Sequence, residues 1–209
     1  MIAIIDYRMG NLRSVEKAFE KIGAKVLVTS QDKDLEKAKA IVLPGVGAFG
    51  QGMKHLRDLG IIPTLLEEIK KGKPFLGICL GMQLLFSYSQ EHGIYKGLDI
   101  IKGIVRRFPK NLKIPHMGWN QINKIKNQKS QVQKNDILED IPDNTFFYFV
   151  HSYYCIPKDK DIVLATTDYG IRFVSVIQKD NIFGIQFHPE KSQNFGLKIL
   201  KNFVKIANS

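Results

Sequence analysis

The sequence predicts an α/β fold: an open, mostly parallel β-sheet flanked by helices, with antiparallel strands added in the C-terminal half. In the first half of the chain, short apolar runs bounded by turn residues alternate with segments of helical spacing. Strands that are apolar throughout are typical of a parallel sheet covered on both faces. Beyond about residue 100, most connections are too short for crossover helices, which favours antiparallel pairing.

The first half contains four expected strands separated by segments of helical periodicity. Gly23 ends the first helix, and Pro44-Gly45 ends the third strand. The strands are 2–5, 25–29, 41–43 and 75–78; the helices are 11–22, a segment with Leu65, Leu66 and Ile69 that ends at Gly72, and 82–86.

The second half is rich in expected strands that extend the sheet. They are 101–108, 118–125, 146–155, 162–167, 173–178 and 182–187, and an amphipathic helix over 192–207 packs back on the sheet. We find no internal repeat, low-complexity tract or domain boundary in the sequence. We therefore expect a single domain over 1–209.

The composition argues against several classes of protein. Of the 209 residues, 44% are hydrophobic and 24% are charged, as in a soluble globular chain that needs no disulfide or structural metal to fold. Cys79 and Cys155 lie far apart and form no ligand cluster, so we expect a reducing compartment and no metal site. No apolar run approaches about 18 residues and no basic leader is present, so we expect a cytoplasmic protein that does not enter a membrane.

The formal net charge of +11 is concentrated in one stretch. The segment from Lys102 to Lys134 contains nine cations and no Asp or Glu. A basic balance of this kind is compatible with a nucleic-acid-binding module, an acidic partner or a solvated surface. The stretch lacks the aromatic and glycine interleaving of RNA-binding platforms, so we favour a solvated, lysine-rich loop around 127–133.

The sharpest local motif is Gly77-Ile78-Cys79-Leu80-Gly81, between an expected strand and an expected helix. It has the pattern of a nucleophile elbow with cysteine in place of serine, and its glycines permit a strained turn. At a helix N-terminus the thiolate of Cys79 is favoured, and the N–H of Leu80 points toward a developing oxyanion. A structural cysteine between two packing glycines is the alternative that the pentapeptide alone leaves open.

Of the five histidines, His188 stands where a catalytic base is expected, at the end of a strand in an open α/β sheet. Pro189 favours an extended predecessor, so that Glu190 can hold one ring nitrogen of His188 while the other faces Cys79. The glycines of the segment 44–47 can turn backbone amides toward a neighbouring strand end, where they would supply a second oxyanion donor.

Together these segments resemble the triad (class I) glutamine amidotransferases, over essentially the whole chain. Within that family, the sequence is most similar to the glutaminase subunits of imidazole glycerol phosphate synthases, from histidine biosynthesis. The segments that carry the resemblance are Asp6-Tyr7 with 10–12, 44–47, 77–83, 115–120, 149–153 and 186–192.

The resemblance implies a class I amidotransferase fold and the hydrolysis of L-glutamine to glutamate and ammonia through a γ-glutamyl thioester on Cys79, with no cofactor. By similarity, His188 would be the base and Glu190 would orient it. The oxyanion hole would consist of the amides of Leu80 and of Val46 or Gly47. The α-amino and α-carboxylate groups of glutamine would be held by Gln83, Glu91, Ser152 and Tyr153.

The resemblance also implies a heterodimer with a cyclase subunit, a (β/α)8 barrel that receives the ammonia. The residues that would contact this partner are Asn11, Met117, Trp119 and Lys191. Trp119 offers a large, rigid apolar surface that suits an interface, although a core position on a strand fits the sequence nearly as well. The length of 209 residues fits a glutaminase domain without an attached synthase, so we expect a separate partner chain.

One residue departs from the family pattern, since Arg8 stands where glycine is usual, inside the expected interface. This leaves open a paralogous glutaminase that supplies ammonia to a surface-sugar synthase. A cysteine hydrolase that needs no partner is another alternative, but Glu190 and the segment 116–120 count against it.

Overall fold

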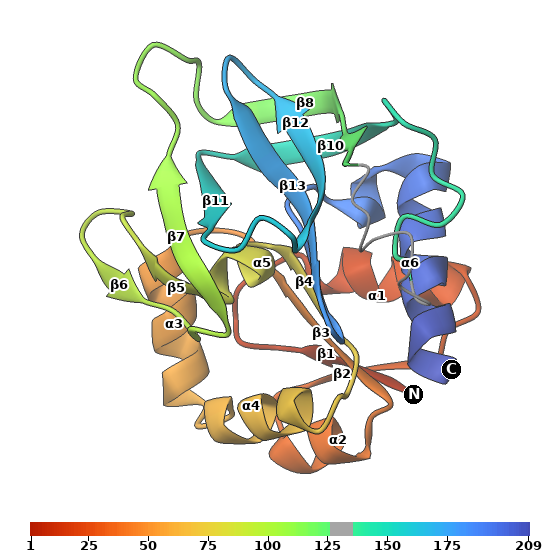
Figure 1. Cartoon of the computed structure of the whole chain (residues 1–209). Helices are drawn as coiled ribbons and strands as arrows, with labels where there is room; N and C mark the ends of the chain where they lie inside the picture. The colour runs from red at the N-terminus through yellow and green to blue at the C-terminus, as the bar shows by residue number, and fades with distance from the viewer. Residues whose placement is uncertain (126–135) are drawn as a thin grey trace.

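An eight-stranded sheet with the order β2-β1-β3-β4-β14-β13-β12-β9 forms the centre of the computed structural model, which describes residues 1–125 and 136–209 (Figure 1). The parallel strands are β1 (Ile2–Ile5), β2 (Val26–Thr29), β3 (Ala40–Gly45), β4 (Phe75–Cys79) and β14 (Ile182–Ile185). The antiparallel strands are β13 (Arg172–Lys179), β12 (Val163–Asp168) and β9 (Asn123–Lys124). The predicted α/β class is confirmed.

Helices cover both faces of the sheet because successive side chains of its parallel strands are buried on opposite sides. Ile2 and Ile4 of β1 belong to the core beneath α1 (Leu12–Lys21) and α6 (Gln193–Asn208). Ala3 and Ile5 belong to the core on the other face of the sheet, beneath α2 (Asp32–Lys37), α3 (Phe49–Asp58) and α4 (Ile62–Lys70). Burial on both sides explains why such strands are continuous apolar runs.

Two smaller sheets lie on the side of the molecule opposite α2 and α4 (Figure 1). In one, β8 (His116–Gln121) pairs with β10 (Phe146–His151). The other has the order β11-β7-β5-β6 and consists of β11 (Tyr153–Pro157), β7 (Ile101–Arg107), β5 (Phe86–Ser89) and β6 (Tyr95–Lys96). The prediction that all the later strands extend the central sheet is therefore wrong for β7, β8, β10 and β11.

The predicted strands 118–125 and 146–155 are each divided between two sheets, and both breaks have local causes. Between β10 and β11 the chain turns at Ser152, whose carbonyl oxygen accepts a hydrogen bond from the backbone N–H of Phe108 at 3.1 Å. Between β8 and β9 the N–H of Ile122 donates to the carbonyl of Thr145 at 3.0 Å. The alternation of buried residues continues across Ser152, so the periodicity does not show the break between β10 and β11.

Three further boundaries differ from the prediction. The helix after Cys79 is α5 (Leu80–Leu84), and β5 begins already at Phe86, where the prediction extends the helix to residue 86. All five residues of α5 are buried, so no polar face marks its end. Strand β3 continues through Pro44 and Gly45 instead of ending before them, and β14 ends at Ile185 rather than at residue 187.

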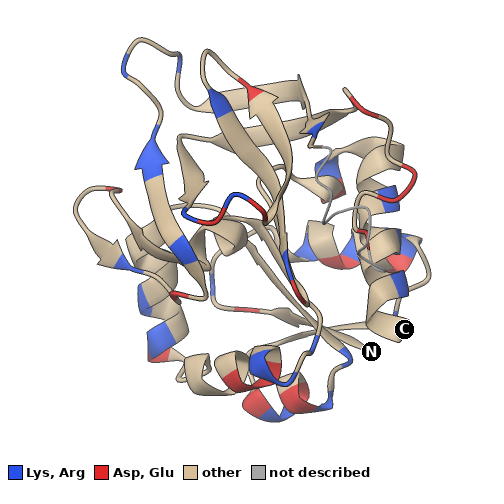
Figure 2. Ribbon diagram, viewed as in Figure 1, with Lys and Arg blue, Asp and Glu red and all other residues tan. Residues whose placement is uncertain are grey.

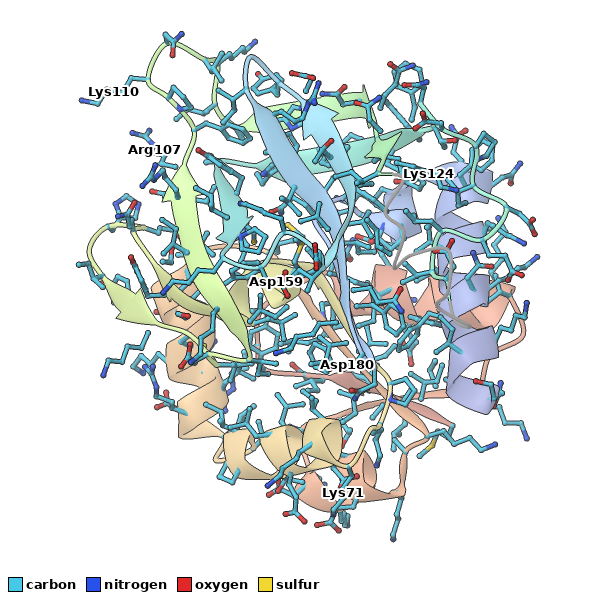
Figure 3. The ribbon with its side chains drawn as sticks, in the orientation of Figure 1. Lys71, Arg107, Lys110, Lys124, Asp159 and Asp180 are labelled. Carbon is cyan, nitrogen blue, oxygen red and sulfur yellow. The ribbon has the colours of Figure 1, made fainter. Side chains whose placement is uncertain are left out.

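Much of the basic stretch lies at the molecular surface. Arg106, Arg107, Lys110 and Lys113 are exposed on β7 and the loop that follows it (Figures 2 and 3). Lys126, Lys129, Lys134 and the predicted loop 127–133 lie outside the described residues. Within residues 1–125 and 136–209, no helix is both long and apolar enough to cross a membrane.

Arg8, where the family pattern has glycine, adopts a left-handed backbone conformation with φ 62°. A side chain in this conformation costs roughly 1–2 kcal/mol. The backbone N–H of Arg8 donates to a carboxylate oxygen of Asp6 at 3.0 Å, which holds the turn in place. The glycine preference at this position therefore has a backbone cause, independent of any partner.

We predict that Arg8→Gly raises the free energy of unfolding by about 1 kcal/mol and Tm by roughly 2–4 °C, because glycine adopts this φ without strain. The matched control is Lys17→Gly, which removes the same charge from an exposed position in α1 and lowers stability by about 1 kcal/mol. Thermal unfolding of the three proteins measures both effects. An Arg8→Gly variant that is less stable than the original would contradict the strain argument.

Candidate active site

Cys79 sits on a strained turn between β4 and α5, with φ 53° and ψ −108°. Residues other than glycine rarely adopt such a conformation. The turn depends on close backbone packing on both sides. A Cβ atom at Gly77 would lie 2.8 Å from the backbone of Gly81, and one at Gly81 would lie 1.7 Å from the carbonyl oxygen of Leu43. The structure thus places Cys79 on the kind of elbow that the pentapeptide predicts, at the carboxyl end of a central strand.

His188 and Glu190 form a buried pair next to this elbow. The ring Nδ1 of His188 lies 2.8 Å from a carboxylate oxygen of Glu190, and the two side chains are 3% and 1% exposed. Because a carboxylate only accepts, Nδ1–H is the donor and Nε2 is the ring atom left for chemistry. Among the described residues, Nε2 is buried and has no hydrogen-bond partner.

Cys79 and Glu190 together favour the charged form of the His188 ring. Burial by itself lowers the pKa of His188. The negative charge of Cys79, the direct interaction of its side chain with His188 and the hydrogen bond to Glu190 outweigh the effect of burial. Together they raise the pKa of His188 to about 10. The His188 ring is therefore an imidazolium near pH 7 and can give a proton from Nε2.

A cavity of about 420 Å³ opens over Cys79, a volume within the usual range of small-molecule sites. It brings together all the predicted oxyanion and substrate residues, from five separate elements and loops. Its walls include Val46, Gly47, Leu80, Gln83, Glu91, Ser152, Tyr153 and Lys191, and also Pro115, Val150 and His151.

Gln83 and Glu91 both offer acceptor atoms to this cavity. The amide nitrogen of Gln83 donates to the backbone carbonyl of Tyr153 and to the side-chain oxygen of Gln186, each at 3.1 Å. Both of its N–H groups are therefore used, which leaves the amide oxygen for a ligand. One carboxylate oxygen of Glu91 accepts from the N–H of Phe49 at 2.6 Å, at the first turn of α3. An amide oxygen and a carboxylate suit an ammonium group.

His151 belongs to the cavity wall, although its motif alone predicts no role for it. Its Nδ1 donates to the carbonyl of Tyr153 at 2.8 Å, and its Nε2 lies 3.0 Å from Nδ1 of His116. Burial lowers the pKa of His151 to about 3 and that of His116 to about 4. Both rings are neutral near pH 7, so His188 is the charged histidine of the site.

Three of the four predicted interface residues lie on exposed surface close to the cavity. Met117 and Trp119 on β8 are 66% and 46% exposed, so the structure rules out a core position for Trp119. The side-chain nitrogen Nζ of Lys191 lies 5.6 Å from the ring centroid of Tyr148, and this centroid is 6.1 Å from the ring centroid of Trp119. Asn11 is half-buried and accepts the first hydrogen bonds of α1 through its carbonyl.

In the part of the chain that the structure describes, no group of three or more His, Cys, Asp or Glu side chains is arranged to hold a metal ion.

The chain belongs to the class-I glutamine amidotransferase family, whose model matches residues 3–207. It is 52% identical over 205 residues to "Imidazole glycerol phosphate synthase subunit HisH" of Aquifex aeolicus, covering 98% of this chain and 96% of that protein. The HisH subunit of Methanothermobacter thermautotrophicus is 54% identical over 209 residues and is covered completely, as is this chain.

Solved structures support the fold. PurLQS from Thermotoga maritima superimposes with a TM-score of 0.75 at 17% identity, over 98% of this chain and 97% of that one. A structure described as a glutamine amidotransferase gives a TM-score of 0.74 at 17% identity, with both chains fully covered. At this identity the likeness concerns the fold alone.

We predict that the titration midpoint of His188, followed by NMR of its ring protons, lies near pH 10 and falls in Cys79→Ala, because the largest influence that raises it is lost. The pKa of His188 in the folded chain exceeds 6.5, its ordinary value. Ring protonation therefore stabilises the fold fully below pH 6.5, and this contribution is lost as the pH rises toward about 10. Cys155→Ala, which removes the other thiol, is the matched control and leaves the midpoint in place. An unchanged midpoint in Cys79→Ala would show that the two groups do not interact.

Proposed function

We propose that this chain is the glutaminase subunit of an imidazole glycerol phosphate synthase and that Cys79, His188 and Glu190 are its catalytic residues. The observation that carries the proposal is the buried His188–Glu190 pair beside a cysteine on a strained elbow, at the base of a cavity. Full-length identity of 52% and 54% to two HisH subunits supports the assignment to this synthase. Because the backbone conformation at Arg8 by itself explains a preference for glycine, the arginine there does not point to a surface-sugar synthase.

In the first half-reaction, the Cys79 thiolate attacks the side-chain carbonyl carbon of glutamine, and the carbonyl oxygen becomes an oxyanion. The backbone amides of Leu80 and of Val46 or Gly47 stabilise this charge, an effect worth about 10²–10³ in rate for each donor. His188 transfers the proton on Nε2 to the leaving nitrogen. The C–N bond breaks, ammonia departs, and the γ-glutamyl group remains on the sulfur as a thioester.

In the second half-reaction, the neutral His188 ring accepts a proton from water through Nε2. The resulting hydroxide attacks the thioester carbon, the C–S bond breaks, and the sulfur leaves as the thiolate that began the cycle. Glu190 keeps Nδ1 protonated throughout, so the same nitrogen gives and takes the proton in both halves.

Glutamine is recognised by its two α-substituents. The amide oxygen of Gln83 and the carboxylate of Glu91 accept from the α-ammonium group, which suits their available atoms. Ser152 and Tyr153 hold the α-carboxylate, since both line the cavity wall and follow the break after β10.

Ammonia released into water is protonated and loses its nucleophilicity, so we propose a partner that receives it directly. The partner is the cyclase subunit, a (β/α)8 barrel, which docks against Asn11, Met117, Trp119 and Lys191. Lys191 contributes to both the cavity wall and this surface, which supports a short path between them. The exposed aromatic surface of Trp119 supports the same face.

We predict that Cys79→Ala abolishes glutamine hydrolysis while the chain stays folded, because no other group in the cavity can form the thioester. Cys155 is 1% exposed, and burial raises the pKa of its thiol, so Cys155→Ala keeps the activity. Glutamate release and circular dichroism measure the two effects. Turnover retained by Cys79→Ala would remove the mechanism.

We also predict that glutamine hydrolysis by the isolated chain is slow and rises at least tenfold when the cyclase subunit of imidazole glycerol phosphate synthase is added. Trp119→Ala raises the half-saturating cyclase concentration by about tenfold or more, the cost of losing a central aromatic contact. Lys70→Ala, at an exposed position on α4 and away from β8 (Figure 1), leaves it unchanged. Full activity without the partner would contradict the proposed assembly.

A further inference from the structure

A chain of buried hydrogen bonds leads from the backbone carbonyl of Tyr153 through Gln83 and Gln186 to the sulfur of Cys79. The side-chain nitrogen Nε2 of Gln186 lies 3.7 Å from Sγ of Cys79, within hydrogen-bond range for sulfur. Gln186 is completely buried, and Cys79 and Gln83 are each 5% exposed. No step of the mechanism described so far uses Gln186.

The direction of this chain of hydrogen bonds is set by a backbone carbonyl. It does not depend on which side-chain amide atom of Gln83 or Gln186 is assigned as oxygen and which as nitrogen. The carbonyl of Tyr153 can only accept, so the atom of Gln83 that faces it is the nitrogen. That nitrogen also lies 3.1 Å from Gln186, and therefore faces the oxygen of the Gln186 amide. The amide nitrogen of Gln186 is left to face the sulfur, and it can only donate.

Two contacts of the sulfur act in opposite directions. The thiol form of Cys79 donates to the carbonyl oxygen of Val150 at 3.9 Å, and this acceptor disfavours a negative sulfur. The N–H of Gln186 is a donor, which stabilises the thiolate and has no role toward the thiol proton. Gln186 therefore opposes the influence of Val150 at the atom that reacts.

We propose that Gln186 is a positioning residue for the nucleophile: its N–H holds the Cys79 sulfur in place and favours the thiolate, while Gln83 locks the Gln186 amide in the donating orientation. The proposal rests on the proposed function only in taking Cys79 as the nucleophile. It also gives Gln83 a second task, because the same nitrogen that binds Tyr153 fixes Gln186.

The test is the pH dependence of alkylation of Cys79 by iodoacetamide in a Cys155→Ala background, with Gln186→Met and Gln186→Glu. Gln186→Met removes both the donor and the acceptor at nearly constant volume. Gln186→Glu keeps an oxygen for Gln83 but places a carboxylate against the sulfur. We expect the midpoint of the alkylation profile to rise by about one pH unit in Gln186→Met and by more in Gln186→Glu.

The relative size of the midpoint shifts in Gln186→Met and Gln186→Glu distinguishes a positioning role from a purely structural one. If Gln186 served only to satisfy Gln83, Gln186→Glu would be the milder change, since it keeps that hydrogen bond. In the complex with the cyclase subunit, we expect kcat to fall about tenfold or more with KM for glutamine changed by less than about threefold, because the group acts on the sulfur and not on the substrate.

Ser175→Ala is the matched control. Ser175 is completely buried on the neighbouring strand and its carbonyl accepts the backbone N–H of Gln186, which the substitution preserves. It is expected to leave the alkylation midpoint and kcat unchanged. Thermal unfolding of every variant confirms that the comparison is between folded proteins.

An unchanged midpoint in both Gln186 variants, or a larger shift in Gln186→Met than in Gln186→Glu, would overturn the inference while leaving the glutaminase assignment intact. Failure of the proposed function is distinguishable, because in that case the unsubstituted complex itself would not hydrolyse glutamine and Cys79→Ala would change nothing.

Discussion

The contact on which the site depends is the packing of Gly81 against the carbonyl of Leu43, where even a methyl group would lie 1.7 Å from the oxygen. This contact brings the first turn of α5 onto the end of β3. It forces Cys79 into its strained conformation and places it level with Gly45, its partner in the parallel register. Nucleophile and predicted oxyanion segment are therefore held by one backbone arrangement, and neither can shift alone.

The same constraint extends to the predicted docking face. Tyr7 is completely buried with its hydroxyl oxygen against Gly45, and a Cβ at Gly10 would lie 3.3 Å from the Cα of Gly45. The loop after β1, which the resemblance assigns to the partner interface, thus rests directly on the segment that carries Val46 and Gly47. Movement of this loop on docking would reach the strand end that precedes the oxyanion amides, through the Tyr7 side chain and through the backbone contact at Gly10.

The parallel half of the fold, with Cys79 and His188 at strand ends, could be predicted because buried strands and glycine-flanked turns leave local patterns. The two smaller sheets could not be predicted, because the turn at Ser152 divides a run of residues in which buried and less buried positions alternate without a break. The prediction also omits α2, which has only six residues, and α3, in which Gly50 and Gly52 are unfavourable helix residues. It omits the short strands β5 and β6 as well, which offer too few residues for a periodic pattern. His151 and Gln186 lie inside segments that carry the family resemblance. Their roles depend on His116 and Cys79, which lie 35 and 107 residues away in the sequence.

The polar groups that join β8 to the cavity carry no net charge near pH 7. Asn120 donates to Nε2 of His116 at 3.2 Å, His116 donates to His151, and His151 donates to the carbonyl of Tyr153 that also receives Gln83. Burial keeps both rings neutral, and the direction of the chain is fixed by its two ends, an amide N–H that donates and a carbonyl oxygen that accepts. A partner bound at β8 can therefore influence the cavity through this chain by displacing hydrogen-bonded groups, without changing the charge of either ring. The interactions that raise the pKa of His188 therefore come from Cys79 and Glu190 and not from this chain of neutral groups.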